Sequence, residues 1–224
     1  MTVLQLADDG EATDLAAFLS RLLHYDRGAV ARLQAVGKAL AVFGRPPSFE
    51  VLAVRTVRLA KPYENGLDAT LDVTVSAGEL LESLDETAAT AVVPGTVTGP
   101  PWAGVLPPRG GWRPEPGLPA PDALRGLVAG AVAEFRSRTR ELAPEGRTRA
   151  ELDRIGRDIW SRLVGGTRLP VRAVHAAQSL GFLRRRGAVE AGLFSSGAWL
   201  RLRTPYGSVA VRQAGLGAFD VSVR

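Results

Sequence analysis

A pattern that occurs twice, once toward each end of the chain, constrains the fold more than any other feature of the sequence. RGAVARL at residues 27–33 and RGAVEAGL at residues 186–193 each follow an apolar segment with helical spacing. Each copy is followed by a glycine turn, a strand, a turn containing proline, and a further strand that ends in Ala-Val-Arg. Self-similarity of this kind is typical of a duplicated structural unit. We therefore predict two α-β-β-β units.

The duplication predicts which positions superpose. Gly28 is expected to match Gly187, and Arg55 is expected to match Arg212. The first unit has additional strands, because VLQL precedes its helix and apolar residues alternate with polar ones from Leu67 to Val75. The first lobe is therefore predicted to have the order β-α-β-β-β-β-α.

Two further helices are predicted between the repeated units. Asp122 is expected to cap the first of them and Thr148 the second, and Pro144 and Gly146 lie in the turn that joins them. The arginines of this hairpin are expected to form a solvated face. The fold class is thus α+β, with two antiparallel-sheet units joined by an α-helical hairpin. The expected segments are an N-terminal lobe at residues 1–95, a strap rich in Pro, Gly and Trp at residues 96–121, the hairpin at residues 122–166 and a C-terminal lobe at residues 167–224. We expect them to pack as one compact unit.

Composition excludes several classes of protein. The 224 residues include no cysteine, so disulfides, thiolate nucleophiles and cysteine metal sites are ruled out. The acidic N-terminus does not resemble a signal peptide, and no apolar run is long enough to span a bilayer, so we expect a cytoplasmic protein without membrane contact. Residues 1–95 carry a net charge of −5, whereas residues 96–224 carry +10. This asymmetry favours an anionic partner for the second half.

The C-terminal hairpin is the first candidate binding surface. Alternation places Leu200 and Leu202 on one face and leaves the arginines and a tryptophan on the other. Cations beside an indole ring can hold phosphate and stack a base. The alternative is an ordinary polar sheet face, or a face covered by the helices with the tryptophan in the core. The candidate residues are Arg184, Arg185, Arg186, Trp199, Arg201, Arg203 and Arg212.

The strap is the second candidate. Its segment GPPWAGVLPPRGGW, residues 99–112, is stiffened by two Pro-Pro pairs, and its indole rings must either pack on the protein or face a partner. We predict that the strap is ordered and that Trp102 or Trp112 is at least half buried. Its candidate binding residues are Trp102, Pro107, Pro108, Arg109 and Trp112.

No catalytic or metal site is predicted, and no cofactor is expected. His24 and His175 have no serine or carboxylate at a catalytic spacing. Asp68 and Asp72 lie on one strand face but four residues apart, which is more than about 10 Å by strand rise. An enzyme whose site is assembled from residues distant in the sequence remains an alternative.

Two resemblances follow from these motifs. PPWAGVLPPRGGW together with SLGFL and WLRLRTPYGSVAVR resembles an uncharacterised family of actinobacterial cytoplasmic proteins, which implies no activity. The run from Val3 to Leu84, which includes DVTVSAGELLESL, is similar in layout to a domain of the DNA sliding clamps. That resemblance implies duplicated units with helices lining a basic channel, although this chain differs from the clamps in length and in its inserted hairpin.

Three functional hypotheses result. The favoured one is a non-enzymatic binding or scaffold protein that contacts a macromolecule, protein or nucleic acid, through the basic lobe or the strap. The second is a nucleic-acid-binding protein, either clamp-like or a winged helix-turn-helix formed by TRAELDRIGRDIW, VRAVHAAQSLGFL and the following hairpin. The third is an enzyme whose site no motif reveals. The sequence does not predict the oligomeric state.

Overall fold

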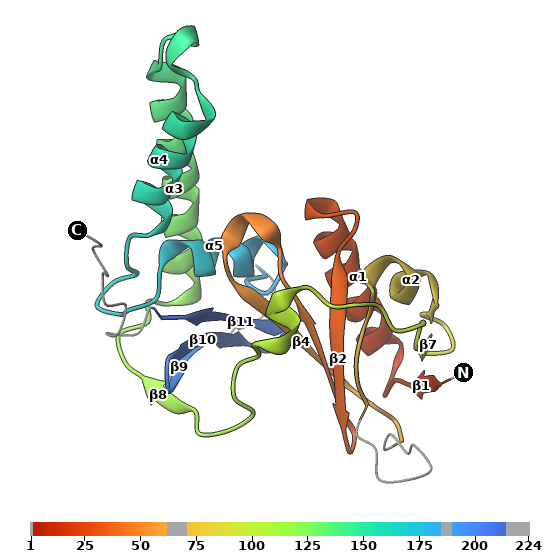
Figure 1. Ribbon diagram of the computed structural model, residues 1–224. Coiled ribbons are helices and arrows are strands. Elements are labelled where there is room, and N and C mark those ends of the chain that lie inside the picture. The colour runs from red at the N-terminus through yellow and green to blue at the C-terminus, as the bar shows by residue number, and fades with distance from the viewer. Residues whose placement is uncertain (1, 62–70, 185–189, 214–224) are drawn as a thin grey trace, which may run out of the picture.

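The computed structural model describes residues 2–61, 71–184 and 190–213 (Figure 1). Within these residues the largest element is an eight-stranded antiparallel sheet with the strand order β5-β2-β3-β4-β11-β10-β9-β8. Its strands are β2 (Val30–Val36), β3 (Ala39–Gly44), β4 (Leu52–Arg58), β5 (Asp72–Ser76), β8 (Arg113–Glu115), β9 (Gly192–Ser196), β10 (Trp199–Thr204) and β11 (Gly207–Arg212). A smaller sheet has the order β1-β7-β6 and consists of β1 (Val3–Gln5), β6 (Leu84–Asp85) and β7 (Thr90–Val92). The predicted α+β class is confirmed.

The α-helices of the described chain are α1 (Asp9–Tyr25), α2 (Ala77–Glu82), α3 (Pro121–Glu141), α4 (Arg149–Trp160) and α5 (Val171–Ser179). The cap predicted for α4 is confirmed, because Thr148 accepts a hydrogen bond from a backbone N–H of the first turn, and Ser76 caps α2 in the same way. The cap predicted for α3 is wrong: this helix begins at Pro121, a favoured first residue, and Asp122 lies inside its first turn. Helix α1 begins at Asp9 and is capped by Asp8, which accepts a hydrogen bond from the backbone N–H of Glu11.

Two three-stranded halves form the centre of the large sheet. Strands β2, β3 and β4 follow α1, strands β9, β10 and β11 follow α5, and β4 pairs with β11 in the middle, where Val54 lies opposite Ser208. Both halves have the same strand order when read outward from this pair. The predicted α-β-β-β units are thus confirmed, and the antiparallel pairing relates them by an approximate two-fold axis. The predicted match of Gly28 involves Gly187, which lies outside the described residues.

The predicted match of Arg55 with Arg212 is wrong. The first hairpins of the two halves superpose at their glycine turns, which places Ala39 on Trp199. Ala39 pairs with Arg58 and Trp199 pairs with Arg212, so Arg58 is the residue that corresponds to Arg212. Arg55 instead lies on the face that carries α1. The shared Ala-Val-Arg is misleading because the connection from β3 to β4 is longer than the tight turn from β10 to β11.

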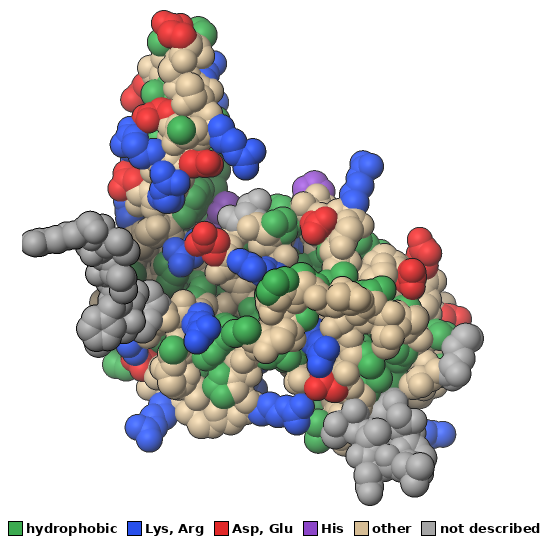
Figure 2. Space-filling view, viewed as in Figure 1, with side chains coloured by type: hydrophobic (Ala, Val, Ile, Leu, Met, Phe, Trp, Pro, Cys, Tyr) green, Lys and Arg blue, Asp and Glu red, His purple; other side chains and the backbone are tan. Residues whose placement is uncertain are grey.

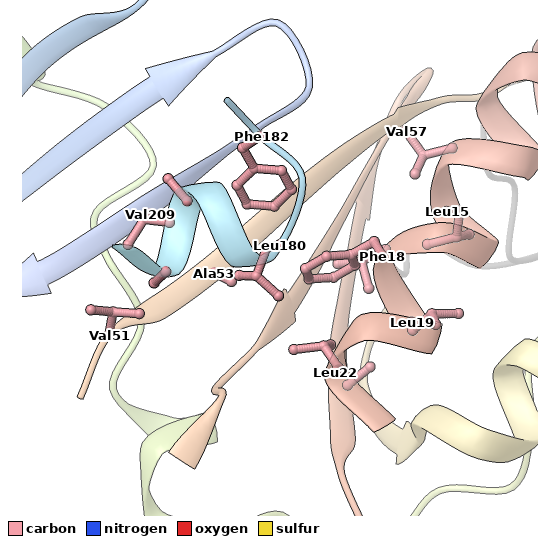
Figure 3. Close-up of a cluster of buried hydrophobic side chains, with 14 of the residues drawn as sticks. Leu15, Phe18, Leu19, Leu22, Val51, Ala53, Val57, Leu180, Phe182 and Val209 are labelled. Atoms are coloured by element: carbon pink, nitrogen blue, oxygen red, sulfur yellow. The ribbon is translucent and has the colours of Figure 1, made fainter. Parts of the chain in front are cut away.

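The core lies between the sheet and the helices α1 and α5 (Figure 3). Phe18 of α1 meets Phe182, which follows α5, and the two rings stack with their centroids 5.8 Å apart. Val57 of β4 and Val209 of β11 belong to the same buried cluster on the sheet side. Each such side chain contributes about 2 kcal/mol by leaving water. Because the rings come from different units, the two halves share one core.

A buried arginine also joins the units. Arg55 of β4 is only 7% exposed; its Nη1 donates to the carbonyl oxygen of Tyr206 at 2.9 Å, and its Nη2 donates to Glu11 at 3.0 Å and lies 3.2 Å from Asp14. Arg184 reaches the same Asp14 at 2.5 Å, and its guanidinium lies 4.3 Å above the Tyr206 ring. Arg184 and Tyr206 belong to the second unit, whereas both carboxylates belong to α1. We call these five residues the Arg55 network.

Helices α3 and α4 form the predicted hairpin, which projects from the body of the protein (Figure 1). Its surface carries both signs of charge (Figure 2). Arg162 binds Glu134 at 2.6 Å, and Arg138 binds Asp158. These two arginines therefore join the two helices, whereas the sequence predicted only a solvated face. Hydrogen bonds from Arg162 and Arg138 lower the pKa of Glu134 and of Asp158, respectively. In the described part of the chain, no helix combines the length and the apolar character needed to span a membrane.

A candidate anion-binding groove

The strap crosses the face of the large sheet that is turned away from α1 and α5, which we call the open face. At one edge Thr96 bridges Val75 of β5, and at the other edge β8 pairs with β9. Between them, Trp102 packs on a small apolar cluster of the open face that comprises Phe43, Leu52 and Val54. Figure 1 shows this segment in front of β4. The strap is therefore held at both edges and in the middle, as the ordered state predicted from the sequence requires.

A groove of about 850 Å³ opens beside the strap, over the C-terminal half of the open face. Arg109 and Trp112 of the strap line it, together with Arg201 and the exposed Arg203 of β10. Arg201 and Arg203 point to the same side of the sheet, because they are two residues apart on one strand. Their partners on β11 are Ala210 and Ser208. Among the described residues that line the groove, the acidic one is Glu190. Three arginines thus converge on a hollow that contains one carboxylate.

Arg201 is the most unusual of these cations. It is half-buried, its Nε donates to the buried Ser208 Oγ at 2.8 Å, and its guanidinium lies 5.6 Å from the centre of the Trp112 ring. Burial lowers the pKa of Arg201, and the positive charge of Arg203 lowers it further. No carboxylate of the described residues lies within ion-pair distance of it. Such a partly desolvated cation is ready to gain free energy from an anion.

Trp112 is positioned by its own loop. Its Nε1–H donates to the carbonyl oxygen of Pro108 at 3.0 Å, and Ser196 of β9 donates to the carbonyl oxygen of Gly110 at 3.2 Å. Both Trp112 and Trp102 are half-buried, which confirms the burial predicted for the strap. The indole of Trp112 therefore forms a fixed wall of the groove.

The structure separates the other candidates of the basic face. Arg184 belongs to the Arg55 network on the helix-covered side, so its charge is used inside the protein. Trp199 and Arg212 share the open face with Arg201, but they pair with each other at the far end of β10 and do not line the groove. Arg185 and Arg186 lie outside the described residues.

The strap candidates also have different roles. Trp102 anchors the strap, Pro107 and Pro108 shape the loop, and only Arg109 and Trp112 line the groove. Trp102 instead borders a second hollow, together with Arg45 and Pro100. The two candidate surfaces of the sequence thus meet in one place, at Arg109, Trp112, Arg201 and Arg203.

Three contributors to the groove were missed by sequence reasoning. Phe194 lies opposite both Arg201 and Pro114 in the ladders, so it stands on the open face between them. Gly192 is two residues before it on the same face, and Ser208 supports Arg201. Glycine inside a strand was the available signal, because it often marks a close approach of another group.

A second cluster of charged residues lies at the start of α1. Asp8, Asp9 and Asp14 line a hollow there with Arg55 and Arg58. Arg58 donates to Asp8 at 2.9 Å and to Glu11 at 2.8 Å. In the described residues no group of three or more histidine, aspartate or glutamate side chains is arranged to hold a metal ion. Asp8, Glu11 and Asp14 are instead paired with arginines.

Comparison with family models gives two matches. Residues 1–104 match a domain of unknown function (DUF8010), and residues 107–216 match another domain of unknown function (DUF8185). The boundary between them falls in the strap. No curated protein matches the chain.

Comparison with solved structures shows a sliding-clamp-like fold. The DNA polymerase III subunit beta from Pseudomonas aeruginosa is similar with a TM-score of 0.54 and 13% identity over 94% of this chain and 63% of that one. A structure of the DNA polymerase sliding clamp from Pseudomonas aeruginosa gives 0.50 and 14% over 98% of this chain and 66% of that one. The chain thus spans less than two thirds of the length of these proteins. At such identities the similarity establishes the fold alone, and the chain combines two domains of unknown function in a sliding-clamp-like fold.

Proposed function

We propose that this protein is a non-enzymatic binding protein that holds an anionic segment of a macromolecular partner in the groove beside the strap. The observation that carries the proposal is the position of Trp112 over Arg201, which unites the strap and the basic hairpin at one site. A fold like that of a sliding clamp is compatible with a scaffold role, and the groove supplies the chemistry of contact. Arg109, Arg201 and Arg203 would provide the attraction, and the fixed walls would provide the shape.

The resemblance to the clamps implies helices that line a basic channel, and the helices on the covered face of the sheet do not have this character. The exposed residues of α1 include Asp9, Thr13 and His24, and α5 exposes Gln178. Neither helix presents a row of cations, and the α3–α4 hairpin rises on that side of the sheet (Figure 1). We therefore place the binding surface of this chain on the open face.

The winged helix-turn-helix alternative is not supported by the position of α5. Val171, Ala173, Val174, Ala176 and Ala177 are all buried in this helix, which packs against β11 and α3. A recognition helix must expose a row of side chains to the bases. Helix α5 is instead a core helix.

Binding of polyanions at two salt concentrations tests the proposal. We expect the wild type to bind a labelled 12-residue polyglutamate or a 12-nucleotide DNA, with an affinity that falls steeply as salt rises. Replacing Arg201 and Arg203 by glutamine should reduce the slope of log affinity against log salt by about 1.4 for a single strand, since two contacts are lost.

The matched control has the same loss of charge elsewhere. Arg136 and Arg157 are exposed on the α3–α4 hairpin, and their replacement by glutamine should leave affinity and slope unchanged. Equal losses in both double variants would show that only net charge matters. Failure of the wild type to bind any polyanion at low salt would refute the proposal.

A further inference from the structure

We infer that the groove is built for single-stranded nucleic acid, with a base stacked on Phe194 and Trp112 and the phosphates held by Arg201 and Arg203. This inference rests on the proposed function and names the class of partner. It depends on the shape and chemistry of the floor of the groove, which the positive charge alone does not explain.

The floor of the groove is aromatic. Phe194 is a partly exposed lining residue, and it lies between Arg201 on β10 and Pro114 on β8 in the ladders. Trp112 lines the same groove, and its ring centre lies 5.6 Å from the Arg201 guanidinium. Aromatic rings and guanidinium groups on one surface are typical of sites for unpaired bases, since every base has a face that stacks.

Gly192 explains how Phe194 is placed. A Cβ atom at position 192 would lie 2.8 Å from Cε2 and 3.2 Å from Cζ of the Phe194 ring. The ring therefore extends along the strand over the backbone of Gly192, in the space that any other side chain would fill. A ring in this position covers the sheet surface and offers a flat platform to the groove.

The arginines are spaced to follow a backbone. Arg201 and Arg203 are two residues apart on one strand, so their Cα atoms are separated by about 7 Å along the groove. This separation is comparable to that of successive phosphates in an extended single strand. Arg109 of the strap lines the same groove and adds a third cation to it.

The same features disfavour the other polyanions. An acidic peptide would use the arginines but would gain little from the rings, and duplex DNA keeps its bases stacked away from any platform. The strap also closes one side of the groove, which suits a thin strand. Preference for single strands is therefore the property that distinguishes this inference from the proposed function.

The experiment compares four labelled probes by fluorescence anisotropy: a 12-nucleotide DNA, a 12-nucleotide RNA, the corresponding 12-base-pair duplex and a 12-residue polyglutamate. We expect the single strands to bind at least about tenfold more tightly than the duplex or the peptide at the same salt. Phe194→Leu removes the ring without changing charge, and should weaken single-strand binding by roughly 5- to 100-fold. Its binding of polyglutamate should stay within about twofold of wild type.

Gly192→Val is a second variant with the same purpose. It displaces the Phe194 ring while adding a residue that favours strands, so it should reproduce the effect of Phe194→Leu in a folded protein. Circular dichroism and the melting temperature verify the fold of both variants. The hairpin control Arg136→Gln with Arg157→Gln should bind single strands as the wild type does.

The outcomes separate the two proposals. If polyglutamate or duplex DNA binds as tightly as the single strands, or if both ring variants bind single strands normally, this inference is wrong and the proposed function stands. If no probe binds to the wild type, both are wrong. A selective loss of single-strand binding in the folded ring variants would establish the stacking platform.

Discussion

Replacement of Arg55 by methionine would remove the central cation of the Arg55 network while keeping a side chain of similar length. The guanidinium is 7% exposed and makes three contacts, with Glu11 at 3.0 Å, with Asp14 at 3.2 Å and with the carbonyl oxygen of Tyr206 at 2.9 Å. Breaking a buried ion pair by removing one partner costs about 3 to 5 kcal/mol, because the remaining charge stays buried.

The expected cost lies at the lower end of this range, because the two carboxylates keep other partners. Glu11 still binds Arg58 at 2.8 Å, and Asp14 still binds Arg184 at 2.5 Å. The carbonyl oxygen of Tyr206 is left without its charged donor, which contributes about 1 to 3 kcal/mol by itself. We therefore expect Arg55→Met to lower the free energy of unfolding by about 3 kcal/mol.

Urea denaturation followed by circular dichroism measures this loss. Arg58→Met is the matched control: Arg58 binds the same Glu11, but its side chain is 68% exposed, so its removal should lower the stability much less than the removal of Arg55. If the two variants lose equal stability, or if Arg55→Met loses less than the control, the reasoning that burial makes this network stabilising is refuted.

Two further predictions concern positions whose environment is tightly defined. His175 stacks on Trp160 with ring centroids 4.6 Å apart, and burial lowers the pKa of His175 below its usual value. The stability that the neutral imidazole contributes should therefore be complete above about pH 6.5 and be lost as the pH falls through the lowered pKa of His175. Urea midpoints measured between pH 7.5 and 5 report this loss, which should be smaller in His175→Phe. A Cβ atom at Gly207, whose φ is +151°, would lie 2.4 Å from Cε1 of the buried Phe182, so Gly207→Ala should cost roughly 2 kcal/mol or more. Gly197→Ala adds its methyl group to open space, and a loss in urea denaturation as large as that of Gly207→Ala would contradict the steric argument.

Much of the local structure could be predicted because it depends on neighbours in the sequence. The caps at Ser76 and Thr148 are set by a side chain that reaches an amide three residues ahead. The opposite orientations of Leu200 and Arg201 follow from the two-residue period of a strand. The cap predicted for α3 failed because a helix start can shift by one or two residues, and packing decides among such neighbours.

The match between Arg55 and Arg212 failed for a related reason. Identical tripeptides end the two strands, but the register of a strand is fixed by the hydrogen bonds that it makes with its partners. The longer connection before β4 shifts that register, and alternation then places Arg55 under α1 and Arg212 on the open face. A repeat in the sequence therefore predicts the strand order better than it predicts equivalent residues.

The sequence by itself determined the two units, the faces of their strands and the presence of a stiff, tryptophan-containing strap, because these features arise from local periodicity and local backbone restriction. Only the tertiary structure decided that Arg109 and Trp112 would meet Arg201 and Arg203, which lie some 90 residues further along the chain. That meeting depends on where the strap is fastened, at Thr96 beside β5 and at β8 beside β9. Hydrogen bonds at two distant sheet edges set the path of the strap, and no pattern within the strap encodes them. The groove is for this reason a product of the whole fold.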